Sequence, residues 1–537
     1  MTRAAVGLFS TPHTPRSASA PKKNRDPAGY GSWERPIEEQ VVQAMVCNTF
    51  GQSFYADAKT LAEETEKVMD TMLAKDSKFF AKALVYSREK GFMRTAPILG
   101  LVKLFSVDRD SAKKVFQRII RTPNDLADFT AILKAKRNSE GGRAVKRAAG
   151  DWLVQKLGAI SKDGEADGQY WAMKYGADKS EGAYSLKDMI QVYHPRVPGN
   201  RRLPLFDYIM GGRRLEGSKK GERSMDLMNF AELPQLEQFE LLKRATSDDE
   251  KVQAIAVGGI PHEVATSFAG TSKKVWNAIV PNLPIFALLR NLATLERHGV
   301  LDDNKKIIQG MFSNPDVIRK SMIFPFRFME ADRHVSTNWV KDCLRDGVEL
   351  SFANLPDIEG RTAVAMDTSG SMGSPISTNS QVSCISVAAL FGMSLMKKTN
   401  GNGRLIGFDH DAREIPFSMR DSILTQAQRV ANPGGGTNHS AALKLLGSDK
   451  VDNIVYITDE QQNSGTPLID AFDAYKRRVN KDVKLFIVDL SNYRNALTPT
   501  DPNMFYMYGW SDAALNFISQ TSKGWNTMTE SIRKIEL

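Results

Sequence analysis

Three short polar motifs in the last third of the chain each lie next to an apolar run or a helical segment. They are DTSGS (367–371), GGGTN (434–438) and TD (458–459). The two serine hydroxyls of the first motif can converge on one point with the aspartate, because Gly370 lets the loop curl. Aspartate, serine and threonine supply hard oxygen atoms, which are the ligands that Mg²⁺ prefers. We predict one divalent cation, Mg²⁺, held by Asp367, Ser369, Ser371, Thr437 and Asp459.

Such a site would keep net positive character, because only two carboxylates face the cation. Its open position would accept a carboxylate or phosphate from a partner, for example an acidic protein ligand. In the alternative interpretation, Asp367 and Ser369 only cap a helix and no metal binds. A two-metal nuclease usually needs more carboxylates than these motifs provide. Asp409 and Asp411 also follow an apolar run, but no partner for them is evident, so we expect a solvated loop there.

The apolar runs beside these motifs have the composition of strands buried on both faces. We expect strands at 361–367, 404–408, 453–459, 483–489 and 504–509, with helices between and after them at 381–398, 419–430, 438–447, 467–479 and 511–521. This alternation predicts an open, mainly parallel sheet with helices on both faces, which is a doubly wound α/β domain. In such a sheet, ligands bind beyond the carboxyl ends of the strands, where the three motifs lie.

Between about 33 and 350 the apolar pattern is helical. In 59–75 and 281–298 apolar residues recur at a spacing of 3.6, and Gly299 follows the second of these segments. Further helices are expected at 37–49, 77–90, 95–105, 111–121, 125–136, 143–157, 185–193, 235–246, 248–257, 261–269 and 273–280. Many short helices with tight turns predict an α-solenoid of stacked, HEAT-like helix pairs, although the sequence has no regular period. The proposed domains are a disordered basic tail (1–32), a helical-repeat domain (33–360) and the α/β domain (361–537).

Positive charge is concentrated in the helical part of the chain. The net charge is +10, yet residues 361–537 hold 18 basic and 17 acidic side chains, so the first 360 residues carry a net charge of +9. This distribution indicates a polyanion partner, RNA or DNA, although solubility explains it equally well. Arg143, Lys146 and Arg147 share one helix face and can neutralise successive phosphates, unless that face is merely solvated. The basic residues just upstream that could extend it are Lys134, Lys136 and Arg137.

The overall composition is that of an ordinary globular protein. The 537 residues are 42% hydrophobic and 25% charged, and the three cysteines are too few and too far apart for a disulfide framework or a zinc site. We find no apolar run long enough to span a membrane and no secretory signal at the start, so we expect a cytoplasmic protein without a membrane partner. No phosphate-binding loop and no paired histidine motif is present, so we expect no enzyme.

Several segments resemble the Ro autoantigen family, which joins a helical TROVE module to a von Willebrand factor A-like domain. They are FGQSFYADAKTLAEE (50–64), GGRAVKRAAGDWL (141–153), SLKDMIQVYHPR (185–196), VWNAIVPNLPIFALLRNL (275–292), FPFRF (324–328) and AMDTSGSM (365–372). The resemblance covers roughly 33–537, and the chain looks like a bacterial member of this family. It identifies 33–360 as the TROVE module and the DTSGS, GGGTN and TD motifs as a metal-ion-dependent adhesion site.

This resemblance implies a ring of helical repeats closed by the A-type domain. Small noncoding Y RNAs would bind its outer surface, and single-stranded 3′ ends of misfolded or structured RNAs would enter its hole. The implied role is RNA quality control and the response to stress, with polynucleotide phosphorylase as the exonuclease partner in bacteria. The family's RNA-binding helix matches the segment with Arg143, and its neighbouring RNA surface adds Lys187, His194 and Arg196.

Two features depart from this family. The DTSGS motif keeps both serines, whereas some animal members have an incomplete motif, and this strengthens the metal prediction. The basic insert 201–223 does not match the family pattern; we expect a mobile loop that either adds phosphate contacts or is plain surface. Two other functions remain open, namely an adhesion scaffold that grips a carboxylate through the metal and, less favoured, a metal-dependent nuclease.

Overall fold

A computed structural model describes most of the chain outside residues 1–35. The described residues are 36–47, 58–137, 141–158, 167–176, 183–197, 199, 203–216, 218, 221–323, 325–376, 382–399, 401–459, 464–490, 501–508 and 512–537. They form two compact units, one of residues 94–311 and one of residues 36–93 with 312–536. The predicted tail, 1–32, lies outside the described residues. None of the described helices is long and apolar enough to cross a membrane.

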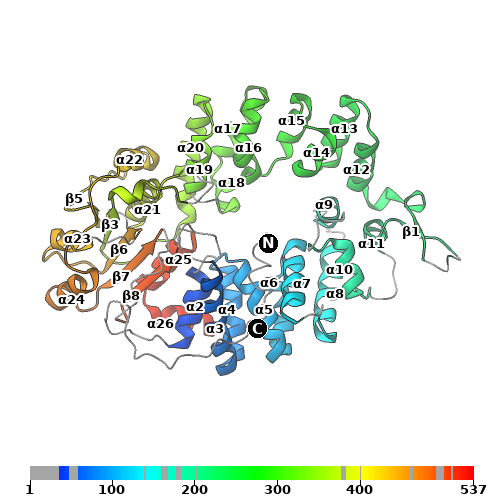
Figure 1. The fold of residues 1–537 in the computed structure, drawn as a ribbon. Coiled ribbons are helices and arrows are strands. Elements are labelled where there is room, and N and C mark those ends of the chain that lie inside the picture. Colours follow the sequence, from blue (N-terminus) through cyan, green and yellow to red (C-terminus); the bar gives the residue numbers. More distant parts are fainter. Residues whose placement is uncertain are drawn as a thin grey trace. The chain divides into compact units, whose positions relative to one another are not determined.

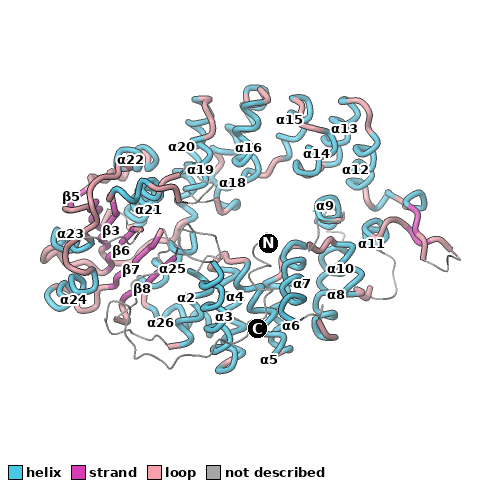
Figure 2. Tube along the Cα trace, in the orientation of Figure 1, coloured by secondary structure: helices cyan, strands magenta, loops and turns pink. Residues whose placement is uncertain are grey.

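The first unit is almost entirely helical (Figures 1 and 2). Its helices are α5 (Thr95–Val107), α6 (Arg109–Ile119), α7 (Pro123–Arg137), α8 (Arg143–Gly158), α9 (Asp167–Tyr175), α10 (Leu186–Tyr193), α11 (Pro204–Ile209), α12 (Pro234–Arg244), α13 (Asp248–Gly258), α14 (His262–Ala269), α15 (Lys273–Ile279), α16 (Ile285–Arg297) and α17 (Lys305–Phe312). Neighbours in sequence pack on one another, as α5 does on α6, α8 on α9 and α12 on α13. This arrangement agrees with the predicted stack of helix pairs.

Side-chain caps set where several of these helices begin. Ser185 and Asp188 form a reciprocal capping box at the start of α10, and Ser247 and Glu250 form another at α13. Each box satisfies backbone N–H groups that have no partner within the helix. Between α5, α6 and α7, three aromatic rings meet edge to face, with centroids 5.4–6.0 Å apart; they belong to Phe105, Phe116 and Phe129. The core of this part of the unit is therefore packed by aromatic side chains.

The second unit contains a six-stranded sheet in the order β5-β4-β3-β6-β7-β8. The strands are β3 (Thr362–Asp367), β4 (Gly403–Phe408), β5 (Ala412–Glu414), β6 (Asn453–Thr458), β7 (Lys484–Asp489) and β8 (Met504–Tyr508). All neighbours are parallel except β4 and β5. The helices that follow the strands are α21 (Cys384–Lys398), α22 (Ile423–Val430), α23 (His439–Leu446), α24 (Leu468–Arg478), α25 (Asp512–Ser522) and α26 (Trp525–Arg533). The predicted doubly wound α/β architecture is confirmed.

Helices from both ends of the chain complete the second unit. These are α2 (Ile37–Cys47), α3 (Ala58–Lys75), α4 (Ser77–Glu89), α18 (Pro315–Ser321), α19 (Pro325–Arg333) and α20 (Asn338–Ser351). Gln43 in α2 donates to the backbone oxygen of Tyr506 in β8 at 2.7 Å. The guanidinium of Arg533 in α26 lies 5.0 Å from the ring centroid of Phe79 in α4. Helices near the start of the chain therefore pack beside its last elements.

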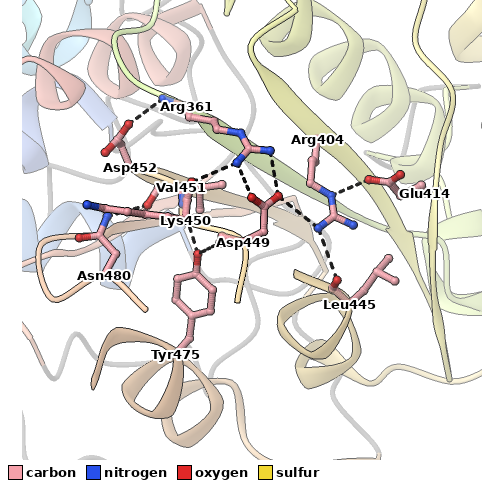
Figure 3. A network of polar contacts seen from close by, with 10 residues as sticks. All are labelled: Arg361, Arg404, Glu414, Leu445, Asp449, Lys450, Val451, Asp452, Tyr475 and Asn480. Carbon is pink, nitrogen blue, oxygen red and sulfur yellow. Dashed lines mark hydrogen bonds and ion pairs between the residues drawn. The ribbon is translucent and has the colours of Figure 1, made fainter. Parts of the chain in front are cut away.

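A network of ion pairs lies where β3 and β4 begin (Figure 3). Asp449 accepts hydrogen bonds from the two terminal guanidinium nitrogens of Arg361, Nη1 and Nη2, and from Arg404, and Arg404 also pairs with Glu414. The hydroxyl of Tyr475 donates to the backbone oxygen of Asp449. These contacts join β3, β4, β5 and the loop before β6 at one edge, whereas the candidate metal ligands lie at the opposite ends of β3 and β6.

Several observed elements were not among the predicted segments. They are the helices α9, α11, α17, α18, α19, α20 and α26 and the antiparallel edge strand β5. The basic insert 201–223 was expected to be a loop, and this is wrong for its described part. That part forms α11 and a short antiparallel pair of β1 (Arg213–Arg214) with β2 (Arg223–Ser224). Gly211 and Gly212, which connect α11 to β1, both have positive φ, a conformation that glycine adopts at little cost.

Candidate functional site

The first three predicted metal ligands come together at the carboxyl end of β3. Asp367 is the last residue of this strand, which lies between β4 and β6, and its side chain is fully buried. One carboxylate oxygen, Oδ1, accepts from the backbone N–H of Ser369 at 2.9 Å. The hydroxyl oxygens of Ser369 and Ser371 lie 3.1 Å apart. The hydroxyls of the DTSGS loop therefore converge beside Asp367 as predicted, although Gly370 is not among the glycines with positive φ.

The other two predicted ligands, Thr437 and Asp459, are also buried in the same unit. The loop that carries Thr437 is tied to the DTSGS loop by two backbone bonds, from Gly370 to Gly435 at 3.1 Å and from Gly434 to Thr368 at 2.8 Å. Asp459 follows the last residue of β6, the strand paired with β3. Loops that are remote in sequence are thus joined at one edge of the sheet, as the α/β prediction requires.

The chemistry of this donor set fits a hard divalent cation. It consists of hydroxyl and carboxylate oxygens, and no soft sulfur or imidazole ligand is among the five residues. In the described part of the chain, no group of three or more His, Cys, Asp or Glu side chains gathers at one point. Burial raises the pKa of Asp367 above its ordinary value, although hydrogen bonds from Thr458 and Ser369 offset part of this. A nearby positive charge would favour the ionised carboxylate.

The prediction of a solvated loop at Asp409 is wrong, because this aspartate shapes the candidate metal site. Its carboxylate pairs with Arg413 at 3.1 Å, and its backbone oxygen accepts from the N–H of Asn438 at 2.8 Å. Gly435, with a φ of 74°, lies so close that an added Cβ would be 3.2 Å from the Cβ of Asp409. A larger residue than glycine there would therefore push the GGGTN loop away from β4.

The predicted basic residues of α7 and α8 lie at the surface of the first unit. Arg143, Lys146 and Arg147 are all exposed on α8, and no ion pair joins any of them to another described residue. Lys134 and Lys136 are exposed on the last turn of α7. Arg137 is half-buried and donates to the backbone oxygen of Val102 at 3.2 Å. An open cavity of about 540 Å³ is lined by three arginines, namely Arg109, Arg137 and Arg143.

The third predicted segment packs directly on these helices. Tyr193 of α10 shares a hydrogen bond with Thr130 of α7 at 2.6 Å, and an added Cβ at Gly150 of α8 would lie 3.3 Å from Pro195. His194 ends α10 in the left-handed conformation, with a φ of 47°, and its side chain is exposed. Arg196 is exposed and Lys187 is half-buried. The fold thus gathers the basic residues of α7, α8 and the α10 segment on three packed elements.

Known protein families match both units. A TROVE domain model matches residues 262–356, and a Ro60 vWA domain model matches residues 361–521. Both matched parts of the chain therefore resemble the Ro family. Two curated relatives carry the name RNA-binding protein RO60. The relative from Caenorhabditis elegans is 23% identical over 77% of this chain and 73% of its own length. The relative from Deinococcus radiodurans is 22% identical over 97% of this chain and 98% of its own length. Neither name is that of an enzyme.

The fold of this chain is also that of a solved structure. The crystal structure of the Deinococcus radiodurans Ro protein superposes with a TM-score of 0.71 at 20% identity, over 91% of this chain and 100% of that one. At this identity the likeness concerns the fold. It supports the division into a helix-rich part and a sheet-containing A-type part that the sequence resemblance implied.

Sequence reasoning missed the residues that hold Asp367 in place. Thr458 donates to Oδ2 of Asp367 at 2.7 Å, and its hydroxyl lies 3.0 Å from Nε2 of the buried His439. The backbone oxygen of His439 accepts from the hydroxyl of Tyr456 at 2.7 Å. Asp489 is a further fully buried carboxylate, at the end of β7, which accepts from Tyr506 at 3.0 Å. Thr458 and Asp489 each end an apolar strand, which was the available signal for these two residues, whereas His439 begins α23 and had no such signal.

Proposed function

We propose that this chain binds RNA through the basic residues of α7, α8 and the α10 segment. We call this set the basic face; its members are Lys134, Lys136, Arg137, Arg143, Lys146, Arg147, Lys187, His194 and Arg196. The observation that carries the proposal is the row of three exposed cations on α8 that form no ion pair with a described residue. Cations that are free of carboxylates can replace the counterions of a phosphate backbone. The names of the two curated relatives support RNA as the polyanion.

The kind of RNA follows from the resemblance to the Ro family. We propose a small noncoding Y RNA on the basic face, and misfolded or structured RNAs that enter a ring through single-stranded 3′ ends. The proposed setting is cytoplasmic RNA quality control and the stress response, with polynucleotide phosphorylase as the exonuclease partner. We retain 33–360 as the TROVE module and 361–537 as the A-type domain. Each of these points rests on family likeness, whereas the basic face rests on this chain's own residues.

We also propose that Asp367, Ser369, Ser371, Thr437 and Asp459 hold one divalent cation, Mg²⁺. Its chemistry would be that of a Lewis acid with an open position. The support is the burial of four of the five residues and the convergence of Ser369 and Ser371 beside the Asp367 carboxylate. An acidic group of a protein partner is the ligand that such a site would grip, so a metal-dependent adhesion function is the second candidate.

Binding of a small structured RNA should depend steeply on salt. A protein that contacts several phosphates releases several counterions, so the affinity should fall by about 10³-fold or more between about 50 and 200 mM salt. A gel-shift titration of the full chain at four salt concentrations measures this slope. A flat response would contradict the basic face, and shortening of the RNA by purified protein with Mg²⁺ would favour the nuclease.

An RNA with an unpaired 3′ tail should bind better than the same RNA with a blunt end. A duplex is about 20 Å across and stiff, whereas a single strand is thin enough to enter the ring that the family resemblance implies. Competition between tailed and blunt versions of one structured RNA measures the preference. The preference should persist in excess chelator, because threading needs no cation at Asp367. Equal binding of both versions would refute entry through the 3′ end.

A further inference from the structure

An open pocket of about 640 Å³ lies in the first unit, lined by residues of α9, α11, α12 and α14. Figure 1 labels these four helices. Its size is that of small-molecule pockets, which are about 300–1,000 Å³. No residue of the basic face lines it, and no residue of the candidate metal site does so. This pocket could not be predicted from the sequence, because two of its four helices, α9 and α11, were not predicted. Its walls come from residues 172 to 268, which the fold brings together.

Four aromatic side chains line the pocket, namely Tyr175, Tyr208, Phe239 and Phe268. The ring of Phe268 meets that of Phe239 edge to face, with the centroids 5.3 Å apart. Phe268 is nevertheless 49% exposed, which is unusual for a side chain of this size. Exposed aromatic rings in proteins that bind single-stranded nucleic acid serve as stacking platforms for bases.

Two ion pairs complete the lining. Lys174 donates to Glu263 at 2.9 Å, and Lys243 donates to Glu240 at 2.7 Å while lying 4.3 Å from the ring centroid of Phe239. The hydroxyl of Tyr208 donates to Glu240 at 2.5 Å. Burial and the Glu240 carboxylate raise the pKa of Tyr208, so its hydroxyl keeps its proton and stays a donor. A carboxylate has about four acceptor positions and an ammonium three donors, so both pairs keep capacity for a ligand.

This lining selects a nucleobase rather than a phosphate. Two carboxylates repel a phosphate, and two paired lysines leave no net positive charge in the pocket. Aromatic faces together with adjacent donors and acceptors suit a flat heterocycle. Guanine alone among the four bases offers two neighbouring N–H donors to one carboxylate, with an acceptor, O6, beside them for an ammonium. We infer that this pocket binds one unpaired guanine base of a bound RNA, and the inference rests on the proposed RNA binding.

The test uses the full chain and ten-nucleotide uridine RNAs with one central guanosine, adenosine or abasic residue, measured by fluorescence anisotropy. The guanosine RNA should bind about 5-fold to 100-fold more tightly than the abasic one, the range expected for one stacked base, with adenosine between them. Phe268→Leu keeps an apolar side chain but removes the ring, and it should abolish this difference. Phe268→Tyr should preserve it. Phe286→Leu is the matched control, because Phe286 is 38% exposed on α16 and does not line the pocket.

Phe268→Leu should lower the affinity for the abasic RNA less than that for the guanosine RNA, since the abasic RNA offers only uracil bases to the pocket. If both RNAs lose affinity equally, or if the parent chain binds both equally, the pocket is not a base site, although RNA binding itself stands. If no RNA binds at all, the proposed function fails. The pocket is then tested with guanosine monophosphate by saturation-transfer difference NMR. The parent chain should give a signal that Phe268→Leu reduces. No signal, or a signal that the substitution leaves unchanged, would overturn the inference.

Discussion

Replacing Arg143, Lys146 and Arg147 together with alanine should abolish tight binding of a small structured RNA. At about 0.15 M salt each lost phosphate contact is worth about 5-fold from counterion release, so three contacts amount to about 100-fold. The salt slope should also fall by about three. The side chains are exposed and form no ion pair with a described residue, so the melting temperature should hardly change. A gel-shift titration at several salt concentrations measures both quantities.

The matched control removes the same charges elsewhere on the surface. Arg297, Lys306 and Arg345 are exposed on α16, α17 and α20, and their triple alanine variant also lowers the net charge by three. It should keep most of the affinity, because a diffuse loss of charge is screened over about 8–10 Å at physiological salt. Equal losses in the two triple variants would mean that general positive charge, rather than the basic face, holds the RNA.

Asp367→Ala should remove the divalent cation from the chain. It deletes one of only two carboxylates in the donor set, and loss of an ion ligand should weaken binding by more than about 100-fold, since even supporting residues cost about 10–100-fold. Isothermal titration with Mg²⁺, and metal content after dialysis, measure the loss. The parent chain should melt at a lower temperature in excess chelator, because a ligand that binds only the native state stabilises it.

Asp411→Ala is the control for this experiment. Asp411 is an exposed aspartate in the loop after β4 and is not among the predicted ligands, so its variant should keep the cation. Binding of small RNA should survive Asp367→Ala, because the basic face and the candidate metal site lie in different units. A collapse of RNA affinity in this variant would show that the two functions are coupled, and the modular interpretation would be wrong.

The sequence alone determined the α/β architecture and the composition of the candidate metal site. Strands buried on both faces must be apolar throughout, so the runs that became β3, β4, β6, β7 and β8 were visible without a structure. The carboxyl ends of parallel strands lie at one edge of a sheet. The polar motifs that follow these strands were therefore expected to lie together at that edge. The shared face of Arg143, Lys146 and Arg147 on α8 could also be predicted from the sequence, because positions i, i+3 and i+4 lie on one face of a helix whatever the helix packs against.

Only the tertiary structure decided which distant segments become neighbours. From the sequence, the helices of residues 37–89 were assigned to the helical region, yet in the structure they pack beside α25 and α26. This packing could not be predicted, because the apolar face of a helix does not specify which element covers it. The support of Asp367 by Thr458 and His439 depends on strand register, which no local pattern reveals. The aromatic pocket needs α9, α11, α12 and α14 at once, and α9 and α11 are too short to show a clear apolar period. The spacing of apolar residues predicts a helix or strand and the face that it buries, whereas long-range packing determines which other element contacts that face.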